Sequence, residues 1–369
     1  MNILRIILLL SFGLFFFISC QTNLNAIYTI SYNKEKIRIP IDSSITRFSR
    51  GMQQIWHHDG KEYYIHGDKA KSVLLFFDLE SGRLDFKIQM ERQGPNGVPS
   101  FNGFFVKSLD SVYVYHGYSY IMWHIDQSGE VKRRYRWSMD NSIDGILLNP
   151  YGEDAIFKGD LVYLPSSPNL RMSEFWQGYV SQSIDLETGE VDFNTKYSPI
   201  FEKGNYIYAF ANVSRTLTPD GKLVYSFGPE DYLYTTDLAT GKVLDRKLAK
   251  SDHITVQMAG DYLEPFDDER WNEDAGTLGY YKKILFDKYR NYYYRIVKLE
   301  SASMYDLKKY SVIVLDEDLN VLGEVVLDDL GLTDNWFITS KGLCSPVSDY
   351  SPEAIENEIL FYCYDFNHK

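Results

Sequence analysis

Six side chains of this sequence carry groups that could bind or transform a ligand. Histidine can act as a metal ligand or as a general acid and base, and arginine can hold a carboxylate through two parallel hydrogen bonds. An amide donates and accepts hydrogen bonds, and an indole can cover a sugar ring. The candidates are His66, Arg92, Asn96, His116, Trp176 and Arg295. Their mixture of cations, amide and aromatic groups favours an anionic or sugar-like ligand over an apolar one.

The motifs around these residues indicate no particular reaction. The sequence contains no His-Glu-x-x-His pair, no Gly-x-Ser-x-Gly turn and no glycine-rich phosphate loop. The acidic segment from Asp261 to Asp274 lacks the spacing of a calcium loop and is interpreted as a solvated face. We therefore predict no metal ion and no cofactor, and we assign no catalytic residue.

The elements that must position the six candidates come from a repeat. The segment "FFDLESGRLDF" at 76–86 recurs as "SIDLETGEVDF" at 183–193 and as "TTDLATGKVLD" at 235–245. In each copy an apolar run ends at an Asp, a short turn with Gly follows, and a second strand-like run begins. Asp and Gly are typical of hairpin turns, because Asp caps backbone N–H groups and Gly adopts a positive φ. The Asp that ends the apolar run recurs at Asp78, Asp126, Asp185, Asp237, Asp316 and Asp365.

Each of these hairpins follows an earlier one, so that a unit holds four strands in about 50 residues. Four-stranded antiparallel units at this period are typical of β-propeller blades. The strands alternate and are rich in Tyr, Val and Ile, which argues against helical repeats. We predict an all-β fold, a six-bladed β-propeller with four-stranded antiparallel blades. A seventh blade would have to lie hidden in 249–279.

The two ends of the chain complement each other. The sixth unit has three strands and no fourth, whereas "IYTISYNKEKIRIPI" near the N-terminus belongs to no unit. We predict that this N-terminal strand closes the last blade and joins the ends of the ring, which removes open sheet edges. Residues 20–369 then form a single domain. Insertions interrupt it at about 165–178 and 249–279, and the second contains a short helix around Asp267 to Ala275.

Residues 1–19 have the pattern of a signal peptide. The apolar stretch from Ile6 to Ile18 is shorter than the roughly 20 residues that span a bilayer. The stretch "FISC" resembles a bacterial lipobox, with Phe17 in place of the usual Leu. This resemblance implies lipid attachment at Cys20, contact with the membrane through that lipid, and a place in the bacterial cell envelope at the outer membrane. An ordinary signal peptide or an uncleaved anchor is the alternative.

Charge and cysteine content limit the partners further. The formal net charge is -13 and no Lys/Arg-rich run occurs, so we expect no nucleic acid partner. Beyond residue 20 the chain has two cysteines, Cys344 and Cys363, each within an apolar run. Free cysteine packs as a small apolar side chain, so we expect two unpaired buried cysteines. A disulfide between them is the alternative.

The loop "QGPNGV" and the segment "FDKYRNYYYRI" add to the lipobox and the six units. With these features the chain resembles the six-bladed, TolB-like propeller lipoproteins of Bacteroidota, and within them a family described only as a domain of unknown function. The resemblance covers residues 20–369. It implies a fold and a cell-envelope location but no activity, because a propeller hosts many functions.

Ligands of propellers usually bind at the mouth of the central channel, where loops from several blades meet. We therefore expect the six candidates at that mouth. The expected function is that of a binding or scaffolding module, with a protein or glycan partner at the channel mouth. The alternative is a glycan- or peptide-processing enzyme, a lyase or hydrolase, with its site there. Two convergent carboxylates, or a His with an Arg or Tyr, would favour the enzyme.

Overall fold

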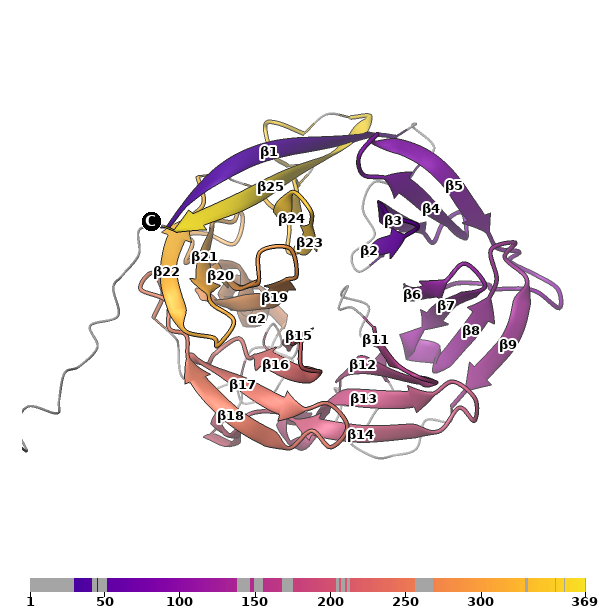
Figure 1. Ribbon diagram of the computed structural model, residues 1–369, viewed down its shortest axis with the longest axis horizontal. Coiled ribbons are helices and arrows are strands. Elements are labelled where there is room, and N and C mark those ends of the chain that lie inside the picture. Colours follow the sequence, from indigo (N-terminus) through magenta and orange to yellow (C-terminus); the bar gives the residue numbers. More distant parts are fainter. Residues whose placement is uncertain are drawn as a thin grey trace, which may run out of the picture.

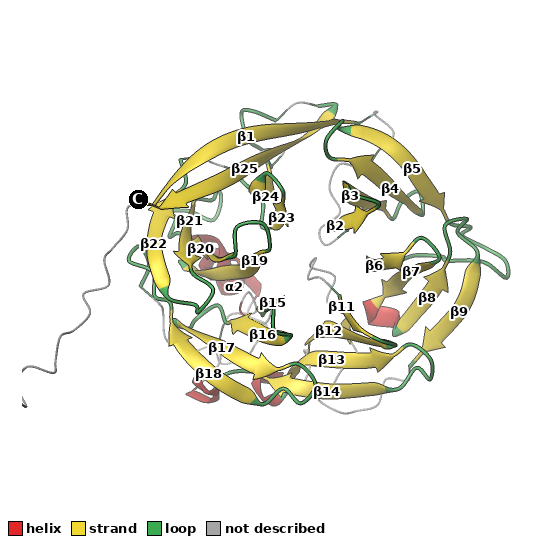
Figure 2. Cartoon of the chain, viewed as in Figure 1, coloured by secondary structure: helices red, strands yellow, loops and turns green. Residues whose placement is uncertain are grey.

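Six antiparallel sheets surround a central axis in the computed structural model of the chain (Figure 1). The arrangement is a β-propeller, as the repeat predicts. Strands make up nearly all of the regular structure, and the helical segments are short (Figure 2). The structure describes residues 30–41, 45, 52–137, 147–148, 155–167, 175–203, 206, 210, 213–255, 268–328, 331–348, 350–354 and 356–368.

Each blade runs from an inner strand at the axis to an outer strand at the rim. Blade one contains β2 (Gln53–His58), β3 (Lys61–Asp68), β4 (Val73–Asp78) and β5 (Arg83–Gln89). Blade two contains β6 (Gly103–Ser108), β7 (Ser111–His116), β8 (Ile121–Ile125) and β9 (Val131–Arg136). Blade three contains β11 (Ile156–Lys158), β12 (Leu161–Ser167), β13 (Tyr179–Asp185) and β14 (Val191–Lys196), and β10 (Leu147–Leu148) also pairs with β12.

The second half of the ring follows the same plan. Blade four contains β15 (Ser214–Leu217), β16 (Lys222–Ser226), β17 (Tyr232–Asp237) and β18 (Val243–Leu248). Blade five contains β19 (Tyr280–Asp287), β20 (Tyr292–Lys298), β21 (Tyr310–Leu315) and β22 (Val321–Val326). Blade six contains β23 (Phe337–Thr339), β24 (Gly342–Pro346), β25 (Glu358–His368) and the N-terminal strand β1 (Ile30–Pro40).

Helices occur only between or beside the strands of the described part. Three are short 3-10 segments, η1 (Gly117–Ser119), η2 (Phe175–Gln177) and η3 (Pro199–Lys203). The helix α2 (Asp268–Thr277) lies in the insertion before blade five, close to the range predicted for it. None of the helices among the described residues has the length and apolar content needed to cross a membrane.

The N-terminal strand closes the ring, which confirms the prediction. β1 pairs antiparallel with β25 along its whole length, from Ile30 opposite His368 to Pro40 opposite Glu358. The side chain of Ile39 is fully buried and belongs to a cluster that also contains residues of blades one and six. Because apolar burial stabilises by roughly 25 cal/mol per Å², this packing, together with the backbone ladder, holds the first and last blades together.

The two cysteines are bonded to each other, so the expectation of unpaired thiols was wrong. Cys344 of β24 and Cys363 of β25 lie directly opposite in the strand register and form a disulfide. Directly opposed residues of antiparallel strands bring their Cβ atoms within reach of each other. The bond therefore joins two strands of the blade that closes the ring.

The repeated Asp caps its turn as predicted. In blade three, the carboxylate of Asp185 accepts hydrogen bonds from the backbone N–H groups of Thr188 (2.8 Å) and Glu187 (2.7 Å). These hydrogen bonds lower the pKa of Asp185. The degenerate copy in blade five lacks the glycine, and there Leu319 takes the positive φ of 63°. The turn is therefore kept where its usual residue is missing.

The glycine of this turn also sets the distance between blades. A Cβ atom at Gly241 of blade four would lie 1.8 Å from the carbonyl oxygen of Asn194, on the outer strand of blade three. At Gly129 of blade two it would lie 2.1 Å from the carbonyl oxygen of Gln89, on the outer strand of blade one. These two turns thus rest directly on the backbone of the preceding blade, whereas Gly189 of blade three faces the ring of Tyr135.

We predict that Gly241→Ala destabilises the protein far more than Gly221→Ala. Both glycines have positive φ, 66° and 81°, but a Cβ at Gly221 would meet no atom within 4 Å. Gly221→Ala should therefore cost about 1–2 kcal/mol from backbone strain alone. Gly241→Ala should cost about 1–3 kcal/mol more because the blades must move apart. Chemical denaturation of both variants measures the difference; equal losses would show that the contact between blades does not require glycine.

Candidate functional site

A cavity of about 410 Å³ lies on the axis of the propeller. Its lining comes mainly from the inner strands of five blades, β2, β11, β15, β19 and β23, which surround the axis in Figure 1. The volume falls within the range of small-molecule sites, which is roughly 300–1,000 Å³. The cavity therefore has the position and the size of a ligand site.

Polar side chains link the inner strands around this cavity. An inner strand has one edge without a strand partner, and the N–H groups of that edge need other acceptors. The hydroxyl of Ser214 in β15 accepts a hydrogen bond from the backbone N–H of Ile284 in β19 (3.1 Å). The side-chain oxygen of Gln54 in β2 accepts one from the N–H of Val106 in β6 (3.1 Å). These hydrogen bonds fix the position of neighbouring inner strands relative to each other along the propeller axis.

The charged groups of the cavity are cations. Arg215, Lys283 and Lys288 line it, and none of the lining residues that the structure describes carries a carboxylate. Arg215 is 4% exposed, and its guanidinium donates hydrogen bonds to the hydroxyl of Ser181 and the carbonyl of Tyr163, both at 2.8 Å. A chain with a net charge of -13 thus has a positive centre.

Lys283 differs from the other two cations. Its side chain is 8% exposed, and its ammonium has no hydrogen-bond or ion-pair partner among the described residues. Lys288 lies at the exposed end of β19, near the ring of Tyr289. An ammonium that is both buried and unpaired is rare, because burial removes the water that would solvate its charge. Lys283 is therefore the most unusual group in the lining.

Three neutral polar groups in the lining also lack partners among the described residues. The side-chain amide of Gln53, the indole N–H of Trp336 and the hydroxyl of Tyr64 are buried without a hydrogen bond. Burial raises the pKa of Tyr64, so this hydroxyl stays protonated. Buried donors without acceptors cost free energy. The cavity therefore presents several donors that a bound molecule could satisfy.

One end of the channel is held by a carboxylate that connects three blades. Glu62 of blade one accepts hydrogen bonds from the hydroxyl of Tyr289 in blade five (2.6 Å) and from the backbone N–H of Ser340 in blade six (3.0 Å). Burial by itself would raise the pKa of Glu62. Hydrogen bonds from Ser340 and Tyr289, together with the nearby His57, lower it below the ordinary value. Glu62 thus acts as a fixed negative charge that ties three turns together.

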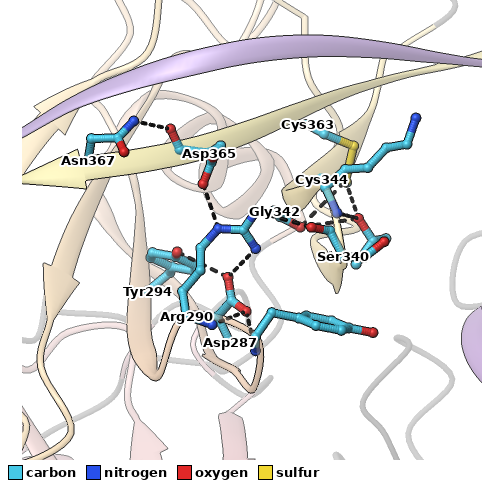
Figure 3. A network of polar contacts seen from close by, with 12 residues as sticks. Asp287, Arg290, Tyr294, Ser340, Gly342, Cys344, Cys363, Asp365 and Asn367 are labelled. Carbon is cyan, nitrogen blue, oxygen red and sulfur yellow. Dashed lines mark hydrogen bonds and ion pairs between the residues drawn. A yellow bond between two sulfur atoms is a disulfide. The ribbon is translucent and has the colours of Figure 1, made fainter.

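A second network joins blades five and six beside this carboxylate, close to the disulfide (Figure 3). The guanidinium of Arg290 contacts Asp365 of β25 (2.5 Å) and Asp287 of β19 (3.1 Å), and it also donates to the carbonyl of Ser340 (3.1 Å). The hydroxyl of Tyr294 donates to Asp287 (3.1 Å). Because Arg290 follows Tyr289 in the chain, this network positions the turn that reaches Glu62.

The six candidates from the sequence do not line the central cavity. Arg295 is fully buried between blades four and five, where it donates to Ser226 (3.0 Å) and to three backbone carbonyls and covers the ring of Tyr281. Burial lowers its pKa to about 10, so it keeps its charge at neutral pH. The expectation that Arg295 lies at the channel mouth was wrong, because its strand position places it between two sheets.

Trp176 also packs in the interior instead of facing a mouth. It is 9% exposed, and its ring stacks on Phe201 and contacts Tyr197 and Tyr206 edge-on. The indole thus holds its own insertion against blade four, because an aromatic ring of this size stabilises most where it is surrounded by other rings.

The other four candidates lie apart from the cavity lining, and ligand binding by them stays a prediction. His66 is fully buried near the end of β3, and His116 is partly buried at the end of β7. Arg92 is exposed and donates to the carbonyl of Ala70 (3.2 Å). Asn96 is partly buried in the loop between blades one and two, next to Pro95, whose carbonyl accepts a hydrogen bond from Arg134 of β9.

The residues that do line the cavity are not among those predicted from the sequence. A recognisable signal exists for two of them: Arg215 in "SRTL" and Lys283 in "YYKKILFD" are cations within the first strand of their units. The first strand of a blade lies at the axis, so a cation there is a channel residue or a contact between blades. Gln53 and Trp336 carry no comparable signal.

Known proteins share the fold. A family model described as a domain of unknown function (DUF4221) matches residues 27–325. A solved structure of a DUF4221 member from Bacteroides vulgatus has a TM-score of 0.79 and 23% sequence identity, and the match covers 92% of this chain and 99% of that chain. A structure from Bacteroides fragilis, described as a "Putative exported protein", has a TM-score of 0.56 and 11% identity over 95% of this chain and 97% of that chain. No curated protein matches the sequence.

We predict that Glu62→Gln lowers stability near neutral pH by about 1–3 kcal/mol, the usual contribution of hydrogen bonds to a charged group. A carboxylate whose folded pKa is lowered stabilises the protein above its ordinary pKa, which is about 4.3, and loses that effect as the pH falls through the folded value. The difference in melting temperature between wild type and variant should therefore shrink in acid. Glu80→Gln, at an exposed turn of blade one, is the control and should be neutral. A difference that stays constant with pH would contradict the role of the charge.

Proposed function

This chain belongs to the DUF4221 family, a domain of unknown function, and on that premise we propose that it is a binding module which holds a small ligand in its central cavity. The observation that carries the proposal is the lining itself. It combines a volume of about 410 Å³ with a buried ammonium and other buried donors that have no hydrogen-bond partner among the described residues. A protein usually satisfies such groups, so their presence in one cavity indicates that a ligand completes them.

Binding is favoured over catalysis by the composition of the lining. A glycan-processing hydrolase uses two carboxylates, and a peptide hydrolase uses an activated nucleophile or a metal ion. The described residues around the cavity include cations, amides, aromatic rings, His57 and Thr216 but no carboxylate, serine or cysteine. A His with an Arg is thus present, but His57 lies beside Glu62 (3.7 Å) and the guanidinium of Arg215 donates to Ser181 and Tyr163, so both are engaged with protein groups. The groups of the lining can orient and neutralise a ligand without attacking it.

We also propose that the protein is exported to the cell envelope and anchored there by lipid on Cys20. Disulfides persist in oxidising compartments and are rare in the cytosol, and Cys344 and Cys363 form one. The similar structure from Bacteroides fragilis carries the description of an exported protein. Cys20 itself lies outside the described residues.

Filling the cavity tests the binding proposal. Ile338→Trp places a large ring in the lining from β23, whereas Val243→Trp adds the same ring on the exposed outer strand β18, where the native side chain is 53% exposed. We expect members of a panel of short glycans, organic acids and peptides to raise the melting temperature of wild type and of Val243→Trp but not of Ile338→Trp. A panel without effect on wild type, or equal shifts in all three proteins, would contradict the proposal.

We predict that Cys20→Ser releases the protein from membranes into the soluble envelope fraction. The thiol of Cys20 is the proposed attachment point, and serine cannot form the thioether. Fractionation of cells, with a labelled fatty acid to follow modification of the wild type, measures the change. If the wild type carries no label and both proteins fractionate alike, the anchor is not on Cys20.

A further inference from the structure

Three donors of the cavity that have no partner in the described part of the chain lie around a single inner strand, β23 of blade six. Trp336 immediately precedes β23, and the flanking inner strands are β19, which carries Lys283, and β2, which carries Gln53. Side chains alternate between the two faces of a strand. Lys283 therefore shares a face of β19 with Leu285, which packs in the same cluster as Trp336.

The same reasoning orients Gln53. It shares a face of β2 with Ile55, which packs against the cluster that contains Phe361 and Cys363 of blade six. The neighbouring Gln54 points the other way and bonds to blade two. Lys283 and Trp336 therefore belong to the face of blade six that packs on blade five, and Gln53 belongs to the face that packs on blade one, so the three donors flank β23 from its two sides.

We propose that the side of the cavity at the contact between blades five and six is a site for the acidic group of an organic anion, with Lys283 as its counter-charge; this inference rests on the proposed function and specifies its ligand. The charge of Lys283 is balanced by no described residue, and the fixed cation Arg215 adds to the positive potential of the same cavity. An acidic group would accept hydrogen bonds from the ammonium of Lys283 and from the indole N–H of Trp336, which share the contact between blades five and six. Hydrogen bonds between charged partners are the strong ones.

The apolar residues of the lining indicate the chemistry of the rest of the ligand. Phe157, Phe286, Phe337 and Ile338 contribute apolar surface to the cavity. A ligand with an acidic group and an apolar or ring-shaped body would bury both parts at once. A small inorganic anion would leave this apolar surface in contact with water, so the lining favours an organic acid over a free inorganic ion.

Two fluorescent probes test the inference because they differ only in the acidic group. Anilinonaphthalene sulfonate carries a sulfonate on an aromatic body, and phenylnaphthylamine has the same body without a charge. We expect the purified wild-type protein to bind the sulfonate with one site per chain, at least about tenfold more tightly than the neutral probe. We also expect added salt to weaken the binding of the sulfonate alone.

Variants then test whether Lys283 causes the preference for the sulfonate probe over the neutral probe. Lys283→Met keeps the length of the side chain and should reduce the affinity for the sulfonate about tenfold or more, while the affinity for the neutral probe should stay unchanged. Lys283→Arg should retain both. Lys242→Met removes a cation from an exposed position in the repeat turn of blade four and should change neither. Near-ultraviolet circular dichroism checks that each variant keeps its native packing.

The outcomes separate this inference from the proposed function. If wild type binds both probes equally, and Ile338→Trp abolishes both, the cavity is a binding site without preference for anions and only the inference falls. If neither probe binds, or if binding survives in Ile338→Trp, the cavity is not the site and the proposed function falls as well. If Lys283→Met does not fold, the comparison of the two probes on wild type and on Lys283→Arg still decides, because equal affinities overturn the inference.

Discussion

The pairing of β1 with β25 is the interaction on which the remaining structure depends. Each blade of a propeller is stabilised on both faces by its neighbours. Without β1, the last blade would lack its outer strand, so that β25 would have an unpaired edge and blade one would lose part of the surface on which it packs. β1 completes blade six and also provides the surface on which blade one rests, because a Cβ at Gly82 in the first repeat turn would lie 2.7 Å from the carbonyl oxygen of Arg38 in β1. The disulfide joins the adjacent strands of the same blade. The ring is thus reinforced at its seam.

Closure of the ring creates the central channel, and the backbone and polar side chains that border this channel need hydrogen-bond partners. The inner strands have backbone groups without strand partners, and side chains such as Ser214 and Gln54 satisfy some of them. Polar side chains of these strands that line the cavity are removed from bulk water. A buried ammonium such as that of Lys283 costs free energy unless a negative charge balances it, which is the physical reason to connect it with a bound anion.

Two residues of the site expected from the sequence, Arg295 and Trp176, lie elsewhere for reasons that can be traced. Arg295 lies in the segment "YYYRI" and was expected at the channel mouth, but in β20 it is opposite Ile284 and Ile313 in the middle of a sheet. Its guanidinium is satisfied by four acceptors of blade four or the segments that flank it. Trp176 was expected at the channel mouth, yet its ring packs on Tyr197, Phe201 and Tyr206, which come later in the chain. In both cases the partners lie about 20 to 70 residues away and cannot be recognised from local spacing.

The sequence by itself determined the architecture, because the signals for it are local. An Asp that caps its own turn and a glycine with positive φ act within a few residues, so they repeat visibly and predict the hairpins, the blades and, from the missing sixth outer strand, the role of the N-terminal strand. Only the tertiary structure decided the register that bonds Cys344 to Cys363, and only it brought residues as distant as Gln53, Arg215, Lys283 and Trp336 to one cavity. The physical reason is that a propeller places its inner strands around a common axis, so the lining of the channel contains a few residues from each unit, and the partners and burial of each depend on the closed ring.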